Sequence, residues 1–179
     1  MTGVFMRRVG LAAAISGAVL GNLLWASGPA GAAVEAKATY LRLESVSSGK
    51  CLNVTGASWD NGAQVIQWDC GDTPNNNWSF EKLPSGWYQI RAQHSGKCLD
   101  VEGAVWGNGA PVIQWDCKKS TNQSWKIINR AEDGSYMLQA RHSGRCLNVE
   151  GASQDNLARI IQWDCVDTTN NRWFQEEAN

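Results

Sequence analysis

The sequence lacks the residue patterns of several common functional sites. It has only two histidines and no C-x-x-C pair, which argues against a zinc site. It contains no glycine-rich phosphate-binding loop and no set of nucleophile, base and orienting group. No stretch follows the period of an amphipathic helix, and no low-complexity linker divides the chain. We therefore expect neither a metal nor another cofactor, and no helical fold.

Neither sign of charge is in large excess. Residues 33–179 contain 14 basic and 17 acidic residues, which gives a formal charge of −3. Such a mild acidic balance provides no electrostatic surface for nucleic acid or for an anionic membrane. We expect neither of them as a partner.

The one long apolar run lies near the N-terminus. Two arginines precede an apolar stretch over residues 9–25, and an Ala-Gly-Ala sequence ends at Ala32. This is the pattern of a secretory signal peptide, so residues 1–32 are predicted to be removed and the mature chain to be secreted without a membrane span. A membrane anchor is the alternative, but the run contains several small residues and no stop-transfer charges follow it.

A six-residue motif, VIQWDC or IIQWDC, occurs three times. Its copies end at Cys70, Cys117 and Cys165, with spacings of 47 and 48 residues. A fixed period of this length indicates one structural unit repeated three times. The repeats are expected near residues 39–83, 86–130 and 134–177, within a single domain over residues 39–176.

The six cysteines occur two per repeat, and the members of each pair are 19 residues apart. Six cysteines allow 15 pairings, but a repeated unit reuses its own geometry. We therefore predict one disulfide inside each repeat. The predicted bonds are Cys51–Cys70, Cys98–Cys117 and Cys146–Cys165.

Each repeat is predicted to contain four short strands. A strand headed by tyrosine leads through a Ser-Gly turn to a Cys-Leu strand, and a glycine-rich loop then precedes the VIQWDC strand. A polar turn ending in tryptophan closes the unit. Twelve short strands indicate an all-β barrel or sandwich, and three four-stranded units favour a β-trefoil over a propeller, which needs more copies. Leu52, Leu99 and Leu147 are expected to pack toward the shared axis.

Nine of the ten tryptophans follow residue 32, and two sets of three recur with the repeats. One set closes each repeat beside apolar residues and is predicted to lie in the core; it consists of Trp78, Trp125 and Trp173. The other set stands two residues before a cysteine, on a strand that borders a polar loop; it consists of Trp68, Trp115 and Trp163. An exposed indole there provides a flat surface on which a sugar ring can stack, with core packing as the alternative.

Polar residues that suit a sugar site cluster in repeat 2. Asp100 follows the first cysteine by two residues, and Asn122 and Gln123 follow the second by five and six. A disulfide between these cysteines would bring Asp100 and Trp115 into one region. Because an ionised acceptor makes stronger hydrogen bonds to hydroxyl groups than a neutral one, we expect the best sugar site in repeat 2.

The order of these residues resembles that in the ricin-B-type β-trefoil lectins. It consists of Cys-Leu-Asp, then an aromatic residue two positions before the second cysteine, and then Asn-Gln-x-Trp. The resemblance covers residues 39–176 and implies three lobes with up to three shallow sites for galactose or related sugars. Matched by position, the binding residues of repeat 2 are Asp100, Trp115, Asn122 and Gln123. The weaker sites comprise Asn53, Trp68, Asn75 and Asn76 in repeat 1, and Asn148, Trp163, Asn170 and Asn171 in repeat 3.

Two features depart from the pattern of this family. Repeats 1 and 3 have asparagine in place of both the acidic residue and the glutamine of the Q-x-W signature, so weaker binding is expected there. Many members also read Q-L-W-D-C, whereas here Gln114 adjoins Trp115 and must point to the opposite face of the strand. The orientation of Trp115 is left open by the sequence.

An enzyme is the first alternative function. Glycosidases hold two carboxylates about 5–10 Å apart, and an aspartate precedes the second cysteine of each repeat, at Asp69, Asp116 and Asp164. Because this aspartate recurs identically, it is expected to make a structural hydrogen bond at a strand end. We expect no catalysis.

A protein-binding trefoil, such as a protease inhibitor or a toxin's receptor-binding subunit, is the second alternative, because a fold does not determine a function. The sequence favours a secreted, monomeric, non-catalytic lectin. Its expected partners are polysaccharide or glycoprotein glycans with galactose-like or xylan- and arabinose-type sugars.

Overall fold

The computed structural model describes residues 39–178, and the predicted signal peptide lies outside this range. The described residues form twelve strands: β1 (Leu41–Ser45), β2 (Cys51–Val54), β3 (Val65–Trp68), β4 (Asn77–Lys82), β5 (Tyr88–Ala92), β6 (Cys98–Val101), β7 (Val112–Trp115), β8 (Trp125–Ile128), β9 (Met137–Ala140), β10 (Cys146–Val149), β11 (Ile160–Trp163) and β12 (Trp173–Glu177). Short 3₁₀ helices lie between them: η1 (Thr55–Ala57), η2 (Pro74–Asn76), η3 (Glu102–Ala104), η4 (Thr121–Gln123), η5 (Glu150–Ala152) and η6 (Thr169–Asn171). Within the described range, no helix is long and apolar enough to span a membrane.

Six of the strands form a closed antiparallel ring. β1 pairs with β12 and β4, β4 with β5, β5 with β8, and β8 with β9. A bridge between Tyr136, just before β9, and Trp173 of β12 completes the ring. Closure leaves these strands without a free edge for another chain to pair with.

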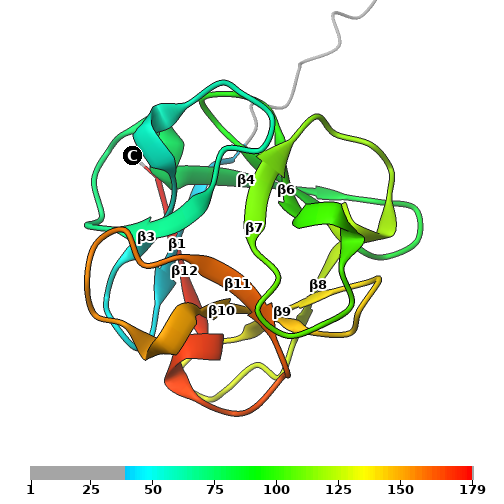
Figure 1. Cartoon of the computed structure of the whole chain (residues 1–179). Coiled ribbons are helices and arrows are strands. Elements are labelled where there is room, and N and C mark those ends of the chain that lie inside the picture. Colours follow the sequence, from blue (N-terminus) through cyan, green and yellow to red (C-terminus); the bar gives the residue numbers. More distant parts are fainter. Residues whose placement is uncertain (1–38, 179) are drawn as a thin grey trace, which may run out of the picture. The chain divides into compact units, whose positions relative to one another are not determined.

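The other six strands form three hairpins, β2–β3, β6–β7 and β10–β11. Single bridges join each hairpin to the next in cyclic order, and Figure 1 shows β3, β7 and β11 grouped around the centre of the molecule. Three equivalent units of four strands, arranged in this way, are a β-trefoil. The prediction of an all-β trefoil is confirmed.

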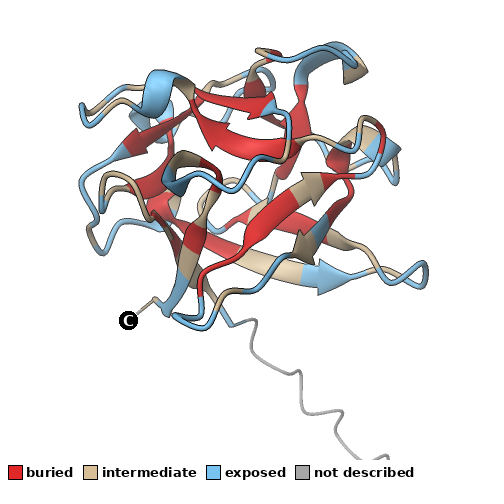
Figure 2. Ribbon diagram, turned by 90° about the horizontal axis from the view of Figure 1, so that it is seen from below, coloured by how far each residue is buried: buried red, intermediate tan, exposed pale blue. Residues whose placement is uncertain are grey.

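The core is built from one tryptophan per repeat and the aliphatic residues of the strands. Trp78, Trp125 and Trp173 have no exposed surface, and neither do Leu52, Leu99 and Leu147. Each indole Nε1–H donates to the carbonyl oxygen of the leucine in its own repeat, at 2.9 to 3.1 Å. The rings are therefore buried without an unpaired donor, and the predicted core role of these tryptophans is confirmed. Figure 2 shows buried strands enclosed by exposed loops.

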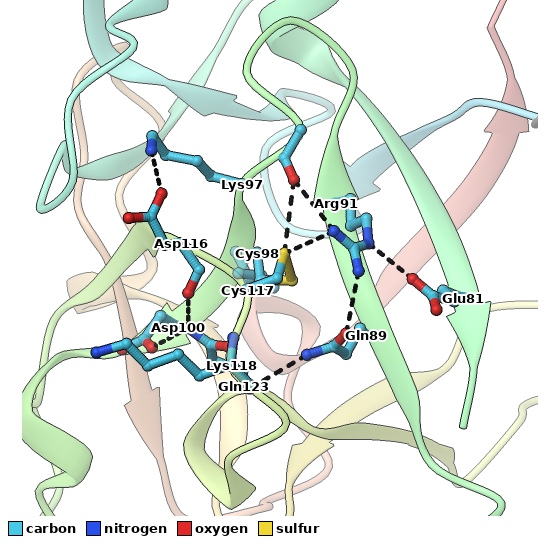
Figure 3. The surroundings of a disulfide bond; sticks show 12 residues. Glu81, Gln89, Arg91, Lys97, Cys98, Asp100, Asp116, Cys117, Lys118 and Gln123 are labelled. Carbon is cyan, nitrogen blue, oxygen red and sulfur yellow. Dashed lines mark hydrogen bonds and ion pairs between the residues drawn. A yellow bond between two sulfur atoms is a disulfide. The ribbon is translucent and has the colours of Figure 1, made fainter. Parts of the chain in front are cut away.

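The three predicted disulfides are present, one in each repeat. The bond between Cys98 and Cys117 joins the start of β6 to the chain just after β7, with the Cα atoms 5.1 Å apart. Figure 3 shows its surroundings: Arg91 donates to the Cys117 sulfur at 2.9 Å and to the Glu81 carboxylate at 2.8 Å. The disulfide fixes the ends of the hairpin that carries Asp100.

The glutamine of each VIQW strand is fully buried and links two repeats. Gln114 Nε2 donates to the carbonyl oxygens of Ser58 and Asp60, at 2.7 and 2.9 Å, and its Oε1 accepts from the Ser95 hydroxyl at 2.7 Å. Ser58 and Asp60 belong to the hairpin loop of repeat 1. Gln67 and Gln162 make the same contacts with the loops of repeats 3 and 2. Each hairpin thus holds the loop of a different repeat.

Candidate functional site

Each repeat carries one shallow cavity of the same construction. A tryptophan from the VIQW strand, the third residue of the Cys-Leu strand and an asparagine from the following 3₁₀ helix line it. The cavity volumes are about 390 Å³ in repeat 1, 440 Å³ in repeat 2 and 540 Å³ in repeat 3. Of these three cavities, that of repeat 3 is the largest, whereas the sequence ranks repeat 2 first on chemistry.

The pairing of β6 with β7 sets the orientation of Trp115. Leu99 lies opposite Gln114, and Asp100 lies opposite Ile113. Leu99 and Gln114 are fully buried, so their face of the hairpin points into the core. Because successive strand residues alternate between faces, Asp100 and Trp115 share the other face, and both line the cavity.

A hydrogen-bonded network holds the Asp100 carboxylate in repeat 2. Asn122 Nδ2 donates to one carboxylate oxygen at 3.0 Å and to the Val101 carbonyl oxygen at 3.0 Å. Gln123 Nε2 donates to the other carboxylate oxygen at 2.7 Å (Figure 3). Asp100, Asn122 and Trp115 meet at the cavity, whereas Gln123 is fully buried and lies behind the carboxylate.

Burial raises the pKa of Asp100 from 3.8 to about 6. Hydrogen bonds from Gln123 and Asn122 and the charge of Lys118 favour the ionised form, but they only partly offset desolvation. The negative charge of Glu102 adds a small further increase. At neutral pH the carboxylate is ionised and accepts hydrogen bonds.

Lys118 distinguishes the cavity of repeat 2 from the other two. Its ammonium nitrogen lies 5.7 Å from the centroid of the Trp115 ring, and both side chains line the cavity. The equivalent residues of repeats 1 and 3 are Gly71 and Val166. A cation over the indole is attracted to its π face and shares that face with any ligand that stacks there.

Repeats 1 and 3 replace the Asp–Gln pair with a pair of asparagines. Asn53 Nδ2 donates to the Asn76 side-chain oxygen, and Asn148 Nδ2 donates to that of Asn171 at 2.6 Å. The hydrogen bond runs in the opposite direction to that in repeat 2, where the residue of the 3₁₀ helix donates. Both sites therefore keep a paired network without a charge at this position.

The remaining predicted residues occupy corresponding places. Asn75 donates to Asn53 Oδ1 at 3.2 Å and to the Val54 carbonyl oxygen at 3.1 Å, while Asn170 donates to the Val149 carbonyl oxygen at 3.1 Å. Each of these asparagines lines the cavity of its repeat together with the indole of Trp68 or Trp163. Asn76 and Asn171 are almost completely buried beneath, although Asn171 reaches the cavity wall.

Some lining residues do not appear among those predicted. A hydroxyl residue two positions before the asparagine lines every cavity, at Thr73, Ser120 and Thr168. Its recurrence in all three repeats was a usable signal. Leu157 lines the cavity of repeat 1 but belongs to repeat 3, and no pattern within one repeat predicts such a contact.

The recurring aspartates at the strand ends connect the repeats. Asp116 accepts hydrogen bonds from Lys97 of its own repeat and, at 2.7 Å, from Asn61 of repeat 1. These two hydrogen bonds lower the pKa of Asp116. Asp69 and Asp164 make equivalent contacts, so the aspartates have the structural role that the sequence favours.

A β-trefoil with a shallow, indole-lined cavity on every lobe has the architecture of a sugar-binding domain. The model of the ricin-type β-trefoil lectin-like domain matches residues 22–115, and that of the ricin-type β-trefoil lectin domain matches residues 86–179. The chain belongs to the family of ricin-type β-trefoil lectins. Membership supports carbohydrate binding as the role of the chain.

Solved structures agree with this assignment. The designed threefold-symmetric protein ThreeFoil is 41% identical, with a TM-score of 0.74 over 76% of this chain and 97% of ThreeFoil. An exo-β-1,3-galactanase from Clostridium thermocellum is 30% identical, with a TM-score of 0.76 over 81% of this chain but only 31% of the enzyme. A Macrolepiota procera ricin B-like lectin in complex with lactose shares the fold at 15% identity, with a TM-score of 0.67 over 79% of this chain and 96% of the lectin. No curated protein sequence gives a significant match.

Proposed function

We propose that the protein is a secreted, monomeric, non-catalytic lectin that binds terminal sugars of polysaccharides or glycoproteins. Galactose-like and xylan- or arabinose-type sugars are the candidate ligands. The observation that carries the proposal is the threefold recurrence of one arrangement, in which an indole, a carboxyl or amide group and an asparagine line a shallow cavity. Stacking on an indole, with polar groups around the ring edge, matches the two kinds of surface on a sugar.

In the proposed site of repeat 2, Trp115 provides the stacking surface and Asp100 accepts hydrogen bonds from sugar hydroxyls. Asn122 contributes its amide oxygen beside the carboxylate, since its Nδ2 is engaged with Asp100 and Val101. Gln123 acts from behind, as a positioning residue that fixes the carboxylate. An ionised acceptor makes the stronger hydrogen bonds, which supports repeat 2 as the tightest site.

Repeats 1 and 3 are proposed as weaker sites of the same design. Trp68 and Trp163 are the stacking surfaces, and both are at least 40% exposed. The polar partners are neutral amides, from Asn53 and Asn75 in repeat 1 and from Asn148 and Asn170 in repeat 3, with Asn76 and Asn171 positioning them from beneath.

For one shallow site of this kind we expect a dissociation constant of about 1 mM, which is a binding free energy of about −4 kcal/mol. Several lobes that engage one polysaccharide or a densely glycosylated surface would raise the effective affinity without new contacts. The proposed function therefore depends on multivalent ligands.

A non-catalytic role is supported by the state of the recurring aspartates. They are exposed, engaged by lysine or arginine and by asparagine, and the pKa values of Asp69 and Asp116 are lowered by those hydrogen bonds. A glycosidase needs one carboxyl group with a raised pKa as its general acid, facing a second carboxylate, and Asp69 and Asp116 do not meet the first requirement. The pKa of Asp100 is raised, but both of its carboxylate oxygens accept hydrogen bonds from Asn122 and Gln123. Secretion is supported by the three disulfides, which persist in oxidising compartments.

The proposal is tested by titrating the protein with galactose, arabinose and xylan fragments while following the indole N–H signals by NMR. In Asp100→Ala, we expect the affinity at Trp115 to fall at least about tenfold, because a charge-assisted hydrogen bond is lost. The matched variant Asn148→Ala should change only the response of Trp163. Unchanged binding in Asp100→Ala would contradict the site assignment.

The function itself is tested on a glycan array, with free sugar as the competitor. A lectin should bind defined glycans and be displaced by the free sugar. Absence of binding to every glycan would contradict the proposed function and favour the protein-binding alternative.

A further inference from the structure

One position in the hairpin loops is glycine in repeats 1 and 2 but leucine in repeat 3. Gly62, Gly109 and Leu157 are equivalent, and all three have positive φ, at 85°, 82° and 71°. This left-handed conformation suits glycine and is unfavourable for leucine. The Leu157 side chain is also 60% exposed, so packing in the core does not explain it.

The loop that carries Leu157 is fastened to repeat 1. The Leu157 N–H donates to the carbonyl oxygen of Gln67 at 3.1 Å, and Gln67 Nε2 donates to that of Asp155 at 2.8 Å. Asn156 Nδ2 donates to the Asp69 carboxylate at 2.9 Å. These bonds hold Leu157 in its strained conformation, and residues kept under strain by their surroundings are concentrated at functional sites.

Leu157 lies in the wall of the repeat 1 cavity, together with Trp68. The equivalent position of repeat 1 likewise lies near the indole of the following repeat, because a Cβ atom added to Gly62 would lie 3.8 Å from Trp115 Cζ3. A Cβ added to Gly109 would meet nothing within 4 Å. Of the three equivalent positions, only that of Leu157 adds a side chain to a neighbouring lobe's cavity.

The chemistry of the repeat 1 cavity differs from that of the other two. Among residues 39–178, no charged side chain lines it, whereas Asp100, Glu102 and Lys118 line the cavity of repeat 2 and Glu150 lines that of repeat 3. Besides Trp68 and Leu157, its apolar lining includes Ile66 and Ala57. The polar groups are amides and a hydroxyl, so the cavity combines a neutral hydrogen-bonding edge with an apolar wall.

We propose that Leu157 of repeat 3 completes the sugar site of repeat 1 and selects a pyranose that carries a methyl group, at a 6-deoxy carbon or on a 2-acetamido group. This inference rests on the proposed function and adds a specificity to one lobe. A methyl group against Trp68 and Leu157 removes apolar surface from water. A hydroxyl group in the same place would lose hydrogen bonds to water without gaining a protein partner.

The test uses three sugars of one configuration: galactose, 6-deoxygalactose and N-acetylgalactosamine. Each is titrated into the full protein, and the indole N–H signals of Trp68, Trp115 and Trp163 report the three sites separately. At Trp68 we expect one of the two methyl-bearing sugars to bind about fourfold more tightly than galactose, the factor that burial of one methylene-sized group supplies. Which sugar is preferred shows where the methyl group sits.

Leu157→Gly is the decisive variant, because glycine already occupies the same position in the other two loops. We expect the preference at Trp68 to fall to about one, while binding at Trp115 and Trp163 stays as in the wild type. Gly62→Leu is the complementary variant, which should give the Trp115 site a preference for the same methyl-bearing sugar.

The outcomes separate the two levels of the proposal. Sugar binding at Trp68 without a methyl preference, or a preference that persists in Leu157→Gly, would overturn the role of Leu157 and leave the lectin function intact. Absence of sugar-dependent shifts at all three indoles would overturn the lectin function and this inference together.

Discussion

At the scale of single residues, one position in the cavity wall carries a carboxylate in repeat 2 and an amide in the other two repeats. Repeat 2 has a carboxylate at Asp100, where the other repeats have the amides of Asn53 and Asn148. The partner in the 3₁₀ helix changes with it, since Gln123 donates to Asp100 while the asparagine pairs reverse the direction of donation. Both members of each pair are hydrogen-bonded, and among the three repeats only repeat 2 has a titratable group at this position.

This difference predicts pH-dependent binding at one lobe. With a pKa of about 6, Asp100 becomes protonated as the pH falls from 7 to 5 and can no longer act as an ionised acceptor. We expect sugar affinity at Trp115 to drop about tenfold over this interval. The reason is that pH 7 and pH 5 lie about one unit above and below the pKa, so the ionised fraction of Asp100 falls about tenfold. Titrations monitored through the Trp115 indole N–H at pH 7, 6 and 5 measure the drop.

Asp100→Asn is the control for this prediction, because it makes repeat 2 resemble its neighbours. Its binding at Trp115 should be weaker at pH 7 and nearly independent of pH, as the binding at Trp68 and Trp163 should be in the wild type. The raised pKa of Asp100 also makes the stability of the protein depend on pH. Because folding raises this pKa, the contribution of Asp100 to the free energy of unfolding decreases as the pH rises from about 4 to about 6. A pH-independent affinity at Trp115 in the wild type would contradict the assignment.

At the scale of elements, the hairpin and the loop of another repeat form one unit. Gln114 holds the repeat 1 loop through two carbonyl oxygens and also binds the Ser95 hydroxyl. Gln114 itself is fully buried and does not line the repeat 2 cavity. The VIQW glutamine is therefore a structural element of the trefoil rather than a sugar contact.

Gln114→Ala is expected to lower the free energy of unfolding by about 3 kcal/mol, because three partly buried hydrogen bonds, each worth about 1 kcal/mol, are lost. Urea denaturation measures the loss, and faster hydrogen exchange over residues 58–63 should locate it in the repeat 1 loop. The exposed Gln154, on the repeat 3 loop, provides the matched control: Gln154→Ala should change stability by less than about 0.5 kcal/mol. Equal effects of the two substitutions would refute this role for Gln114.

The elements that could be predicted from the sequence are those specified within one repeat. Strand positions, the three disulfides and the buried tryptophans follow from alternation, spacing and recurrence, and the structure confirms them. The cavity residues Asp100, Trp115 and Asn122 also come together because the disulfide and the register of β6 with β7 are local.

Contacts between repeats could not be predicted, because pairings between side chains and loops that are 54 to 88 residues apart leave no pattern in either segment. Gln67 holding the repeat 3 loop and Leu157 lining the repeat 1 cavity both depend on how the lobes meet. The burial of Gln123 has another cause. Its position next to Asn122 in sequence gives no indication of which side chain faces the cavity, and the turn of η4 decides it.

At the scale of the whole molecule, each disulfide stays inside its lobe, while the hydrogen bonds of the buried glutamines and strand-end aspartates connect the lobes. The covalent links constrain each hairpin, and the non-covalent links assemble the trefoil. Loss of one disulfide should therefore weaken the whole domain without changing its architecture.

Replacing both Cys98 and Cys117 with serine is expected to lower the free energy of unfolding by about 3 kcal/mol, the value for a loop of this length. Thermal denaturation followed by circular dichroism measures the change. The far-ultraviolet spectrum below the transition should match that of the wild type, and sugar binding at Trp163, in another lobe, should persist. Loss of the folded spectrum at 25 °C would show that the lobes cannot assemble without this bond.

The bridge between Tyr136 and Trp173 that completes the ring also limits the number of repeats that one domain can contain. Open repeat proteins lengthen by adding units at their ends, because each unit contacts only its neighbours. Here the first and last strands of the described range, β1 and β12, already pair with each other, so a fourth unit finds no vacant edge in the ring that residues 39–178 form. Copy number is fixed at three by geometry, and new binding capacity has to come from substitutions within existing lobes or from joining complete domains.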